Sequence, residues 1–308
     1  MRHDPAPARN LSTWQLRTSS LSLGQRTLVM GVVNITPDSF SDGGAFLNPD
    51  AAIAHALQLV EEGADLLDLG AESTRPGSNA GGTTPAVSAD EEQARLLPVL
   101  AAILKAQPNA VVSVDTYKSA TARTALAAGA EIVNDVSGLT WDSELPAVCA
   151  QARCGVILMH TRGRPDEWRT QSQLDSDTLI EAVRSGLATS LATATHAGIS
   201  PNRIVLDPGY GFGKRLNENF SLLARQSELL ALGRPLLAGL SRKSFLGHAL
   251  APLYAGQPAP ALVPIPARET ASIAALVAAI LHGASIVRTH NVRPAVEAAR
   301  IADAVLTA

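Results

Sequence analysis

Short apolar segments alternate with longer amphipathic segments from residue 28 to the end of the chain. The short segments are too short for helices and mostly lack a polar residue at alternate positions, which is typical of strands buried on both faces of a parallel sheet. They lie at residues 28–33, 66–69, 111–114, 132–133, 155–159, 204–206, 236–240 and 285–287. Asp68 and Ser113 are the polar exceptions inside them.

The longer segments between these strands predict helices. They lie at residues 50–62, 90–105, 119–128, 143–152, 177–197, 217–231, 269–282 and 294–306. Gly63, Gly129, Gly198 and Gly283 each follow such a segment, where a left-handed residue commonly ends a helix. Eight strands and eight helices in strict alternation predict an α/β protein, a single (β/α)8 TIM barrel.

A doubly wound open sheet is the main rival, because it uses the same strand and helix units. No G-x-G-x-x-G motif follows the first strand, and polar residues follow nearly every strand instead of gathering at one point, so the barrel is favoured. Residues 14–26 predict a short N-terminal strand or hairpin that caps the bottom of the barrel. We expect residues 1–15 to be flexible, residues 16–308 to form the barrel domain, and the proline-rich segment 251–266 to interrupt its seventh helical unit.

The composition excludes several classes of function. With 25 basic and 28 acidic side chains the formal net charge is −3, which argues against binding to nucleic acid or to an anionic membrane. No apolar run approaches the roughly 20 residues of a membrane span, and the amino terminus lacks the apolar region of a secretory signal. Cys149 and Cys154 cannot form a disulfide framework and fit a reducing compartment, so we expect a cytoplasmic protein.

In a barrel of this kind the active site lies at the carboxyl ends of the strands. Polar side chains stand at or just after all eight predicted strand ends, namely Asn34, Glu72, Asp115, Asn134, His160, Asp207, Lys243 and Arg288. Each of them alone has a structural explanation, because an aspartate after a strand often caps the next helix. Helix caps do not require a lysine or an arginine at these positions. The gathering of these polar residues at one end of the barrel therefore predicts a polar pocket there.

The residue types narrow the chemistry of this pocket. Asp115, Asn134 and Asp207 offer acceptors and a donor suited to a flat, nitrogen-rich heterocycle, and Lys243 suits a carbonyl or ring nitrogen of the same ring. No Ser-His-Asp set, cysteine pair at metal-ligand spacing or Glu-x-x-His arrangement is present, which argues against a protein nucleophile and a tightly bound transition metal.

A second group of residues predicts an anion site. Asn34, Arg288 and His290 lie at the ends of the first and eighth strands, which are neighbours once the barrel closes. A divalent cation there would bridge Asn34 and phosphate oxygens. Arg75, in the loop after the second strand, is typical of a segment that closes over an anion.

At this level of detail the chain resembles the dihydropteroate synthase family. Residues 34–44 (NITPDSFSDGG) and 70–77 (GAESTRPG) are similar to its two signature loops. The resemblance covers about residues 20 to 308 and continues in order through 114–116 (VDT), 134–138 (NDVSG), 158–160 (LMH), 207–209 (DPG), 211–214 (GFGK), 241–244 (SRKS) and 288–290 (RTH).

This resemblance implies a homodimeric barrel enzyme of folate biosynthesis. Such an enzyme joins (7,8-dihydropterin-6-yl)methyl diphosphate to 4-aminobenzoate with Mg²⁺ present, and it releases 7,8-dihydropteroate and diphosphate. Sulfonamide inhibitors compete with the aminobenzoate. The mechanism implied is departure of the diphosphate to leave a pterin-methyl cation, followed by attack of the arylamine.

Site residues follow from the resemblance by matching motif. The pterin ring is assigned to Asp115, Asn134, Met159, Asp207 and Lys243. The diphosphate is assigned to Asn34, Thr74, Arg75, Arg288 and His290, with Mg²⁺ at Asn34. The aminobenzoate is assigned to Phe40, Pro76, Phe212, Lys243 and Ser244. Asp115, Lys243, Arg288 and His290 are the expected catalytic residues.

The chain departs from the family pattern in four places. Residues 78–86 lengthen the second loop, residues 161–168 replace a more usual segment, residues 251–266 form a longer excursion, and the last motif continues into Asn291. Two other functions stay open at this level. A methyltetrahydrofolate-binding methyltransferase barrel would lack the Arg75 and Arg288 anion sites, whereas a non-catalytic pterin-binding paralogue would keep the fold without turnover.

Overall fold

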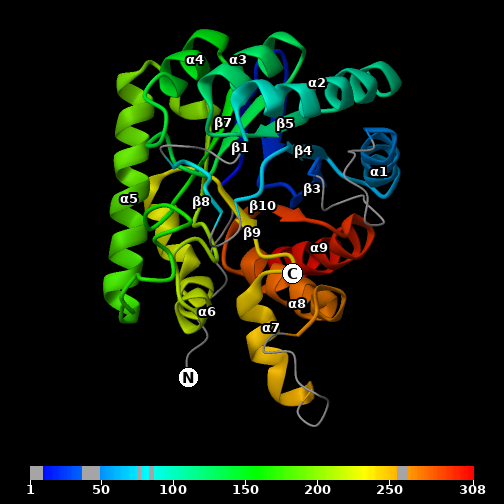
Figure 1. Ribbon diagram of the computed structural model, residues 1–308. Helices are drawn as coiled ribbons and strands as arrows, with labels where there is room; N and C mark the ends of the chain where they lie inside the picture. The colour runs from blue at the N-terminus through cyan, green and yellow to red at the C-terminus, as the bar shows by residue number, and fades with distance from the viewer. Residues whose placement is uncertain (1–9, 37–48, 75–77, 83–86, 255–262) are drawn as a thin grey trace.

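Eight parallel strands close into a barrel in the computed structural model, which describes residues 10–36, 49–74, 78–82, 87–254 and 263–308 (Figure 1). The strand order is β10-β3-β4-β5-β6-β7-β8-β9, so the first and last barrel strands are neighbours. The strands are β3 (Leu28–Asn34), β4 (Leu66–Gly70), β5 (Val112–Asp115), β6 (Ile132–Asp135), β7 (Gly155–Met159), β8 (Ile204–Asp207), β9 (Leu236–Gly239) and β10 (Ala284–Thr289). The barrel prediction is confirmed, and the open doubly wound sheet is wrong.

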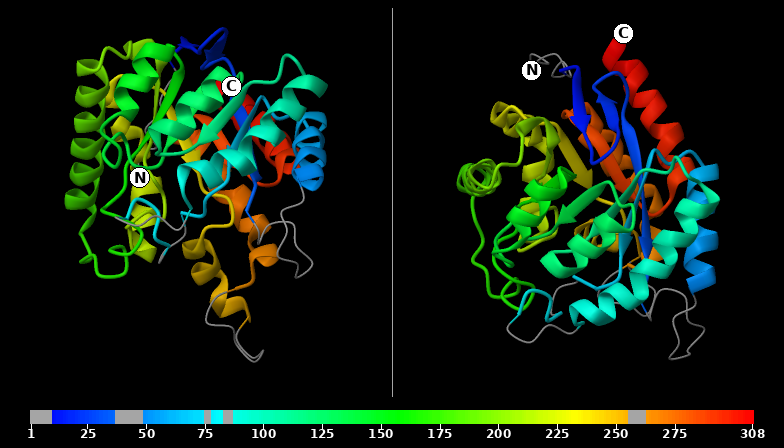
Figure 2. Two further views of the ribbon diagram at one scale, coloured as in Figure 1. Left: turned by 45° about the horizontal axis from the view of Figure 1, so that its top comes forward. Right: turned by 90° about the horizontal axis from the view of Figure 1, so that it is seen from above.

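Helices surround the barrel and follow the strands in alternation (Figures 1 and 2). They are α1 (Pro49–Glu61), α2 (Ala89–Ala106), α3 (Ser119–Ala127), α4 (Leu145–Ala152), α5 (Ser176–His196), α6 (Leu216–Ala224), α7 (Ser244–Leu250), α8 (Glu269–Leu281) and α9 (Val292–Thr307). None of the helices in the described ranges combines the length and apolar character needed to span a bilayer.

Local signals in the sequence explain where these helices begin and end. Ser88 caps α2 by accepting a hydrogen bond from the Glu91 amide at 3.2 Å, and Asp175 caps α5 by accepting one from the Thr178 amide at 2.9 Å. The four predicted glycine stops all have positive φ. At Gly129 φ is 114°, and a Cβ would come within 2.6 Å of the Leu104 side chain, so only glycine fits without a shift.

A two-stranded antiparallel hairpin, β1 (Ser12–Gln15) and β2 (Ser20–Leu23), closes one end of the barrel, opposite α7 (Figure 2). Trp14 is 1% exposed, packs with the barrel interior in one apolar cluster, and donates its Nε1 hydrogen to the Arg203 carbonyl at 2.8 Å. The predicted cap at the barrel bottom is therefore confirmed. β1 begins at Ser12, and burial of Trp14 stabilises its packing against the barrel.

Two helical segments differ from the pattern. The predicted helix 217–231 is α6 followed by a 3-10 helix, Gln226–Leu232. The fully buried Gln226 accepts a hydrogen bond from the Tyr210 hydroxyl and donates to the carbonyls of Ala279 and His282. These bonds to residues far away in sequence form where the α-helix gives way to the 3-10 helix. The pattern also missed α7, a short helix directly after Lys243.

Candidate active site

The carboxyl ends of the barrel strands form the mouth of the barrel, and a partly buried ion-pair network lies there. Arg288 on β10 donates from Nε to Asp68 Oδ2 at 2.6 Å and from Nη2 to Asp115 Oδ2 at 2.9 Å. Asn134 on β6 donates from Nδ2 to the same Asp68 oxygen at 3.0 Å. Asp68 is completely buried, so this carboxylate joins three strands below the surface of the mouth.

Burial and neighbouring charges bring the pKa values of two groups at the mouth, Asp115 and Lys243, close to neutral pH. Burial raises the pKa of Asp115 to about 7; the Arg288 guanidinium opposes this effect, and the Asp68 carboxylate reinforces it. Burial lowers the pKa of Lys243 to about 8, and the positive charge of Arg288 acts in the same direction. Such perturbed groups in a pocket are typical of functional sites.

Arg288 stays charged in these surroundings. Its burial acts to lower its pKa, but attraction to Asp68 and Asp115 outweighs burial, and the pKa is raised. Only two of its N–H groups are used in these bonds, so further donors remain for an anion above the mouth.

The residues assigned to the heterocycle lie around this network. Asp207 ends β8 and is 6% exposed, and its Oδ1 accepts the Gly209 amide at 2.7 Å. Asp207 therefore also stabilises the turn that follows its strand, which is a purely structural role that an aspartate at a strand end can have. Burial raises the pKa of Asp207, against the opposing effects of the Gly209 amide and Lys243. Met159, at the end of the neighbouring β7, is buried in an apolar cluster against which Phe212 packs.

The Lys243 ammonium lies over the Phe212 ring at 4.0 Å from its centroid. This distance suits a cation–π contact, so Phe212 helps to hold the Lys243 side chain at the mouth. The structure thus brings the predicted Lys243 and Phe212 together from the ends of β9 and β8.

Three of the predicted anion residues lie at the ends of neighbouring strands, Arg288 and His290 at the end of β10 and Asn34 at the end of β3. His290 Nδ1 lies 3.0 Å from the Ser241 hydroxyl, which ties the end of β10 to the segment after β9. Asn34 ends β3 and pairs in register with Gly70 on β4. Thr74 is partly buried in the segment after β4. Within the described ranges, no three His, Cys, Asp or Glu side chains converge as a metal site.

A buried charge cluster supports the segment that carries Thr74. Lys118 Nζ donates to Glu72 Oε2 at 2.5 Å and to Glu92 Oε2 at 3.2 Å, and Glu92 also accepts from the hydroxyls of Thr116 and Thr121. Glu72, one of the polar residues at the strand ends, therefore makes an ion pair at the base of the loop.

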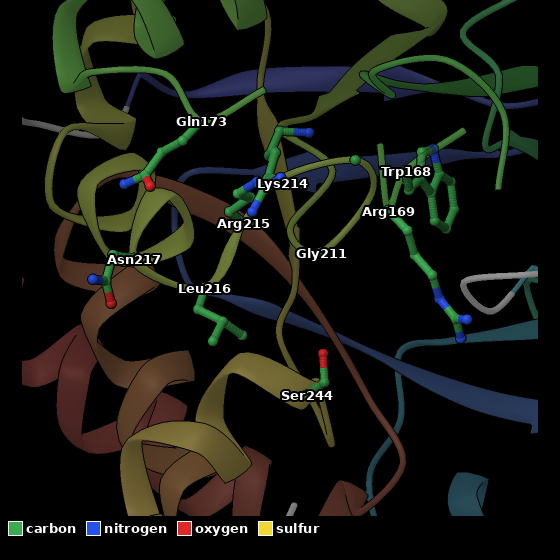
Figure 3. Close-up of a pocket in the computed structure, with 10 residues that line it drawn as sticks. Trp168, Arg169, Gln173, Gly211, Lys214, Arg215, Leu216, Asn217 and Ser244 are labelled. Atoms are coloured by element: carbon green, nitrogen blue, oxygen red, sulfur yellow. The ribbon is translucent and has the colours of Figure 1, made fainter. Parts of the chain in front are cut away.

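A cavity of about 450 Å³ lies where the segments after β7 and β8 meet the first turn of α7, and no residue of the network lines it (Figure 3). Ser244, at the first turn of α7, lines it together with residues that follow β7 and β8. The lining residues are Trp168, Arg169, Gln173, Gly211, Gly213, Lys214, Arg215, Leu216, Asn217 and Ser244. Space for a ligand therefore continues outward from Ser244.

The predicted site residues fall into two groups. Asn34, Thr74, Asp115, Asn134, Met159, Asp207, Phe212, Lys243, Ser244, Arg288 and His290 lie at or just after the carboxyl ends of the barrel strands. Phe40, Arg75 and Pro76 lie outside the described residues. The structure adds Asp68, which the sequence marked only as a polar residue inside an apolar strand.

Comparisons with known proteins agree on one family. A family model described as pterin binding enzyme matches residues 30–290. The dihydropteroate synthase of Synechocystis is 42% identical over 281 residues, which are 91% of this chain and 91% of that protein.

Two solved structures extend this likeness to the fold. Xanthomonas albilineans dihydropteroate synthase with 4-aminobenzoic acid is 38% identical with a TM-score of 0.83, and the match covers 97% of this chain and 100% of that one. Yersinia pestis dihydropteroate synthase in a sulfonamide drug complex is also 38% identical with a TM-score of 0.83, over 96% and 99% of the two chains.

Proposed function

The chain belongs to the dihydropteroate synthase family of pterin-binding enzymes, and from this premise we propose how the barrel mouth divides the work of the reaction. Its activity is that of a transferase, which condenses (7,8-dihydropterin-6-yl)methyl diphosphate with 4-aminobenzoate. The methyltetrahydrofolate-dependent methyltransferase alternative is therefore wrong. The observation that carries the division of roles is the Asp68–Arg288–Asp115 network, because it places one cation between two carboxylates at the mouth.

The pterin ring binds among Asp115, Asn134, Met159, Asp207 and Lys243 in this proposal. Asn134 and Asp207 are 7% and 6% exposed, so their hydrogen bonds to a bound ring form away from bulk water. A buried donor or acceptor left without its partner costs about 1–3 kcal/mol. The pocket therefore discriminates strongly in favour of a ring that satisfies both side chains.

The diphosphate binds at the junction of β10 and β3, toward the unused N–H groups of Arg288 and toward His290. Asn34, Thr74 and Arg75 complete this subsite in the proposal. Asn34 fits Mg²⁺ because this cation takes oxygen ligands and is often held by few protein groups together with substrate phosphates. Mg²⁺ held there would neutralise charge on the diphosphate.

Bond cleavage leaves positive charge on the pterin methylene, and the Asp115 carboxylate stabilises it. The C–O bond to the diphosphate breaks with its electron pair on the diphosphate oxygen. The aminobenzoate nitrogen then forms the C–N bond and loses a proton, so no protein nucleophile is required. Asp115 is effective only when ionised, and its pKa of about 7 places that ionisation near neutral pH.

The aminobenzoate lies against Phe212, Lys243 and Ser244, with Phe40 and Pro76 as further walls, and sulfonamides occupy the same place. This proposal draws support from the relatives solved with 4-aminobenzoic acid and with a sulfonamide drug. The cavity beside Ser244 offers the necessary space.

We also propose a homodimer in the cytoplasm. Exposed apolar side chains, Phe220 on α6, Leu253 on η3 (Ala251–Tyr254) and Ile265 on η4 (Ile265–Arg268), occur on elements that contact α7, and a second copy would cover them. Both cysteines are free and buried, which agrees with a reducing compartment. Sedimentation velocity tests the dimer: a single species of monomer mass at micromolar concentration contradicts it.

Diphosphate release, measured with a coupled assay with and without 4-aminobenzoate, tests the function. We expect release from the pterin diphosphate and Mg²⁺ to depend on 4-aminobenzoate and to yield dihydropteroate. Binding of pterin without any turnover would identify a non-catalytic paralogue instead.

A further inference from the structure

The cavity beside Ser244 has a basic lining in which the arginines carry most of the charge, because burial lowers the pKa of Lys214 to about 7. Among its lining residues Arg169, Lys214 and Arg215 are basic, and no lining residue is acidic. A cavity lined by one sign of charge attracts ligands of the opposite sign. The space next to Ser244 is therefore suited to an anionic group.

Two of the three basic side chains are already engaged. Lys214 Nζ donates to the main-chain carbonyls of His160, Gly209 and Phe212 at 3.2, 2.7 and 3.2 Å. Arg215 donates from Nε and Nη2 to the Gln171 carbonyl at 3.0 and 2.8 Å. Arg169 makes no hydrogen bond or ion pair with the part of the chain that the structure describes, so its guanidinium is the one that a ligand can recruit.

The position of Arg169 is set by the residue before it. Trp168 is 7% exposed, donates from Nε1 to the Gly163 carbonyl at 3.1 Å, and packs edge-to-face on Phe212 with 5.1 Å between ring centroids. Arg162 pairs with Glu218 at 3.4 Å and so ties the segment after β7 to the start of α6. The backbone at Arg169 is thus held at the edge of the cavity, and its side chain extends along one side of the space toward which Ser244 points (Figure 3).

Phe212 links this segment to the mouth. One neighbour of its ring is the Lys243 ammonium, and the other is Trp168. An aminobenzoate beside Phe212 must turn its amine toward the pterin methylene in the mouth. Because the carboxylate is para to the amine, it then points outward, toward Ser244 and the cationic cavity.

We propose that Arg169 is a specificity-determining residue, which attracts the carboxylate of 4-aminobenzoate and favours anionic benzoates over neutral analogues. This inference rests on the proposed placement of the aminobenzoate. Arg169 lies just past residues 161–168, where the chain departs from the family pattern, so the contribution belongs to this protein's own loop. An ion pair between exposed groups is weak, so the expected effect is a few-fold change in KM.

Steady-state kinetics of Arg169→Gln provide the test. We expect KM for 4-aminobenzoate to rise about two- to fivefold, with kcat and the KM of the pterin diphosphate unchanged. The inhibition constant of sulfanilamide, which carries no carboxylate, should stay at its wild-type value. Added salt should raise the wild-type KM for 4-aminobenzoate and have less effect on the variant, because screening weakens the same attraction.

Two further variants make the test decisive. Arg169→Lys keeps the charge, so its KM for 4-aminobenzoate should stay close to the wild-type value. Arg164→Gln removes a charge from the same segment, outside the cavity lining, and should leave that KM unchanged. Equal losses for 4-aminobenzoate and sulfanilamide, equal effects at both arginines, or an unchanged KM would overturn the inference. Failure of the wild type to release diphosphate with 4-aminobenzoate would instead overturn the proposed function.

Discussion

Replacing Asp68 by asparagine removes one negative charge from the mouth and keeps the size of the side chain. The Asp68 carboxylate is fully buried and accepts from Arg288 at 2.6 Å and from Asn134 at 3.0 Å through the same oxygen. The amide oxygen of an asparagine still accepts hydrogen bonds, but it cannot neutralise Arg288. The substitution therefore isolates the charge of Asp68 from its shape.

The structure sets the size of the expected effect. A hydrogen bond to a charged group contributes about 1.5–3 kcal/mol, and a neutral one about 1 kcal/mol. Complete loss of a buried partner costs about 3–5 kcal/mol, but Arg288 retains Asp115 at 2.9 Å. We therefore expect Asp68→Asn to lower the free energy of unfolding by about 2–3 kcal/mol.

The same substitution should change the titration of Asp115. The negative charge of Asp68 helps to raise the pKa of Asp115 to about 7, so its removal favours the ionised form of Asp115 and lowers that pKa. Because the proposed mechanism needs the Asp115 carboxylate, the acidic limb of kcat/KM should move to lower pH.

Two measurements test this reasoning. Urea unfolding near neutral pH gives the change in stability, and kcat/KM measured across neutral pH gives the acidic limb. Ser113→Ala is the matched control, since Ser113 is a buried polar residue on the neighbouring β5 that pairs in register with Asp68, and its hydroxyl has no hydrogen-bond partner among the described residues. We expect it to leave the acidic limb in place.

Two results would refute the roles assigned to the Asp68 charge. An unfolding free energy within about 0.5 kcal/mol of wild type would show that the Asp68 charge contributes little to stability. An acidic limb that stays in place, or moves to higher pH, would show that Asp68 does not act on Asp115.

Four further predictions concern other groups. Activity should fall as pH rises through the Lys243 pKa of about 8, and Lys243→Arg should remove this alkaline limb from the kcat/KM profile because arginine stays charged. Arg288→Gln should weaken binding of the pterin diphosphate by about 1.5–3 kcal/mol more than binding of the bare pterin, measured by calorimetry; equal losses would contradict the anion site. Trp14→Ala should lower the urea-unfolding free energy by about 3–5 kcal/mol, since it empties the hairpin cap. Lys118→Met leaves two buried carboxylates without their cation and should cost about 3–5 kcal/mol in the same assay, with Glu92→Gln in the Lys118→Met background recovering part of the loss.

The architecture and the kinds of residue at the mouth could be predicted from the amino-acid pattern. Apolar segments without polar alternation, spaced by amphipathic segments, predict a parallel sheet, and polar residues after nearly every strand favour its closure into a barrel. The strand ends follow from the same pattern, so Asp115, Asn134, Asp207 and Arg288 could be placed at one face before any coordinates were known. The glycine stops could be predicted as well, because a helix end depends on residues close in sequence.

Which of these residues act on one another depends on how the chain folds in three dimensions. Asp68 and Arg288 are 220 residues apart, and their contact exists because closure of the barrel places β10 beside β3 and β3 beside β4. The pattern separated Arg288 and Asp115 into an anion group and a heterocycle group, whereas the structure joins them through one guanidinium. The place of Arg169 depends likewise on Trp168 packing against Phe212, a contact between two loops. Periodicity reports the local conformation and burial of a segment, but pairwise distances, and the pKa values that they set, depend on how distant segments meet.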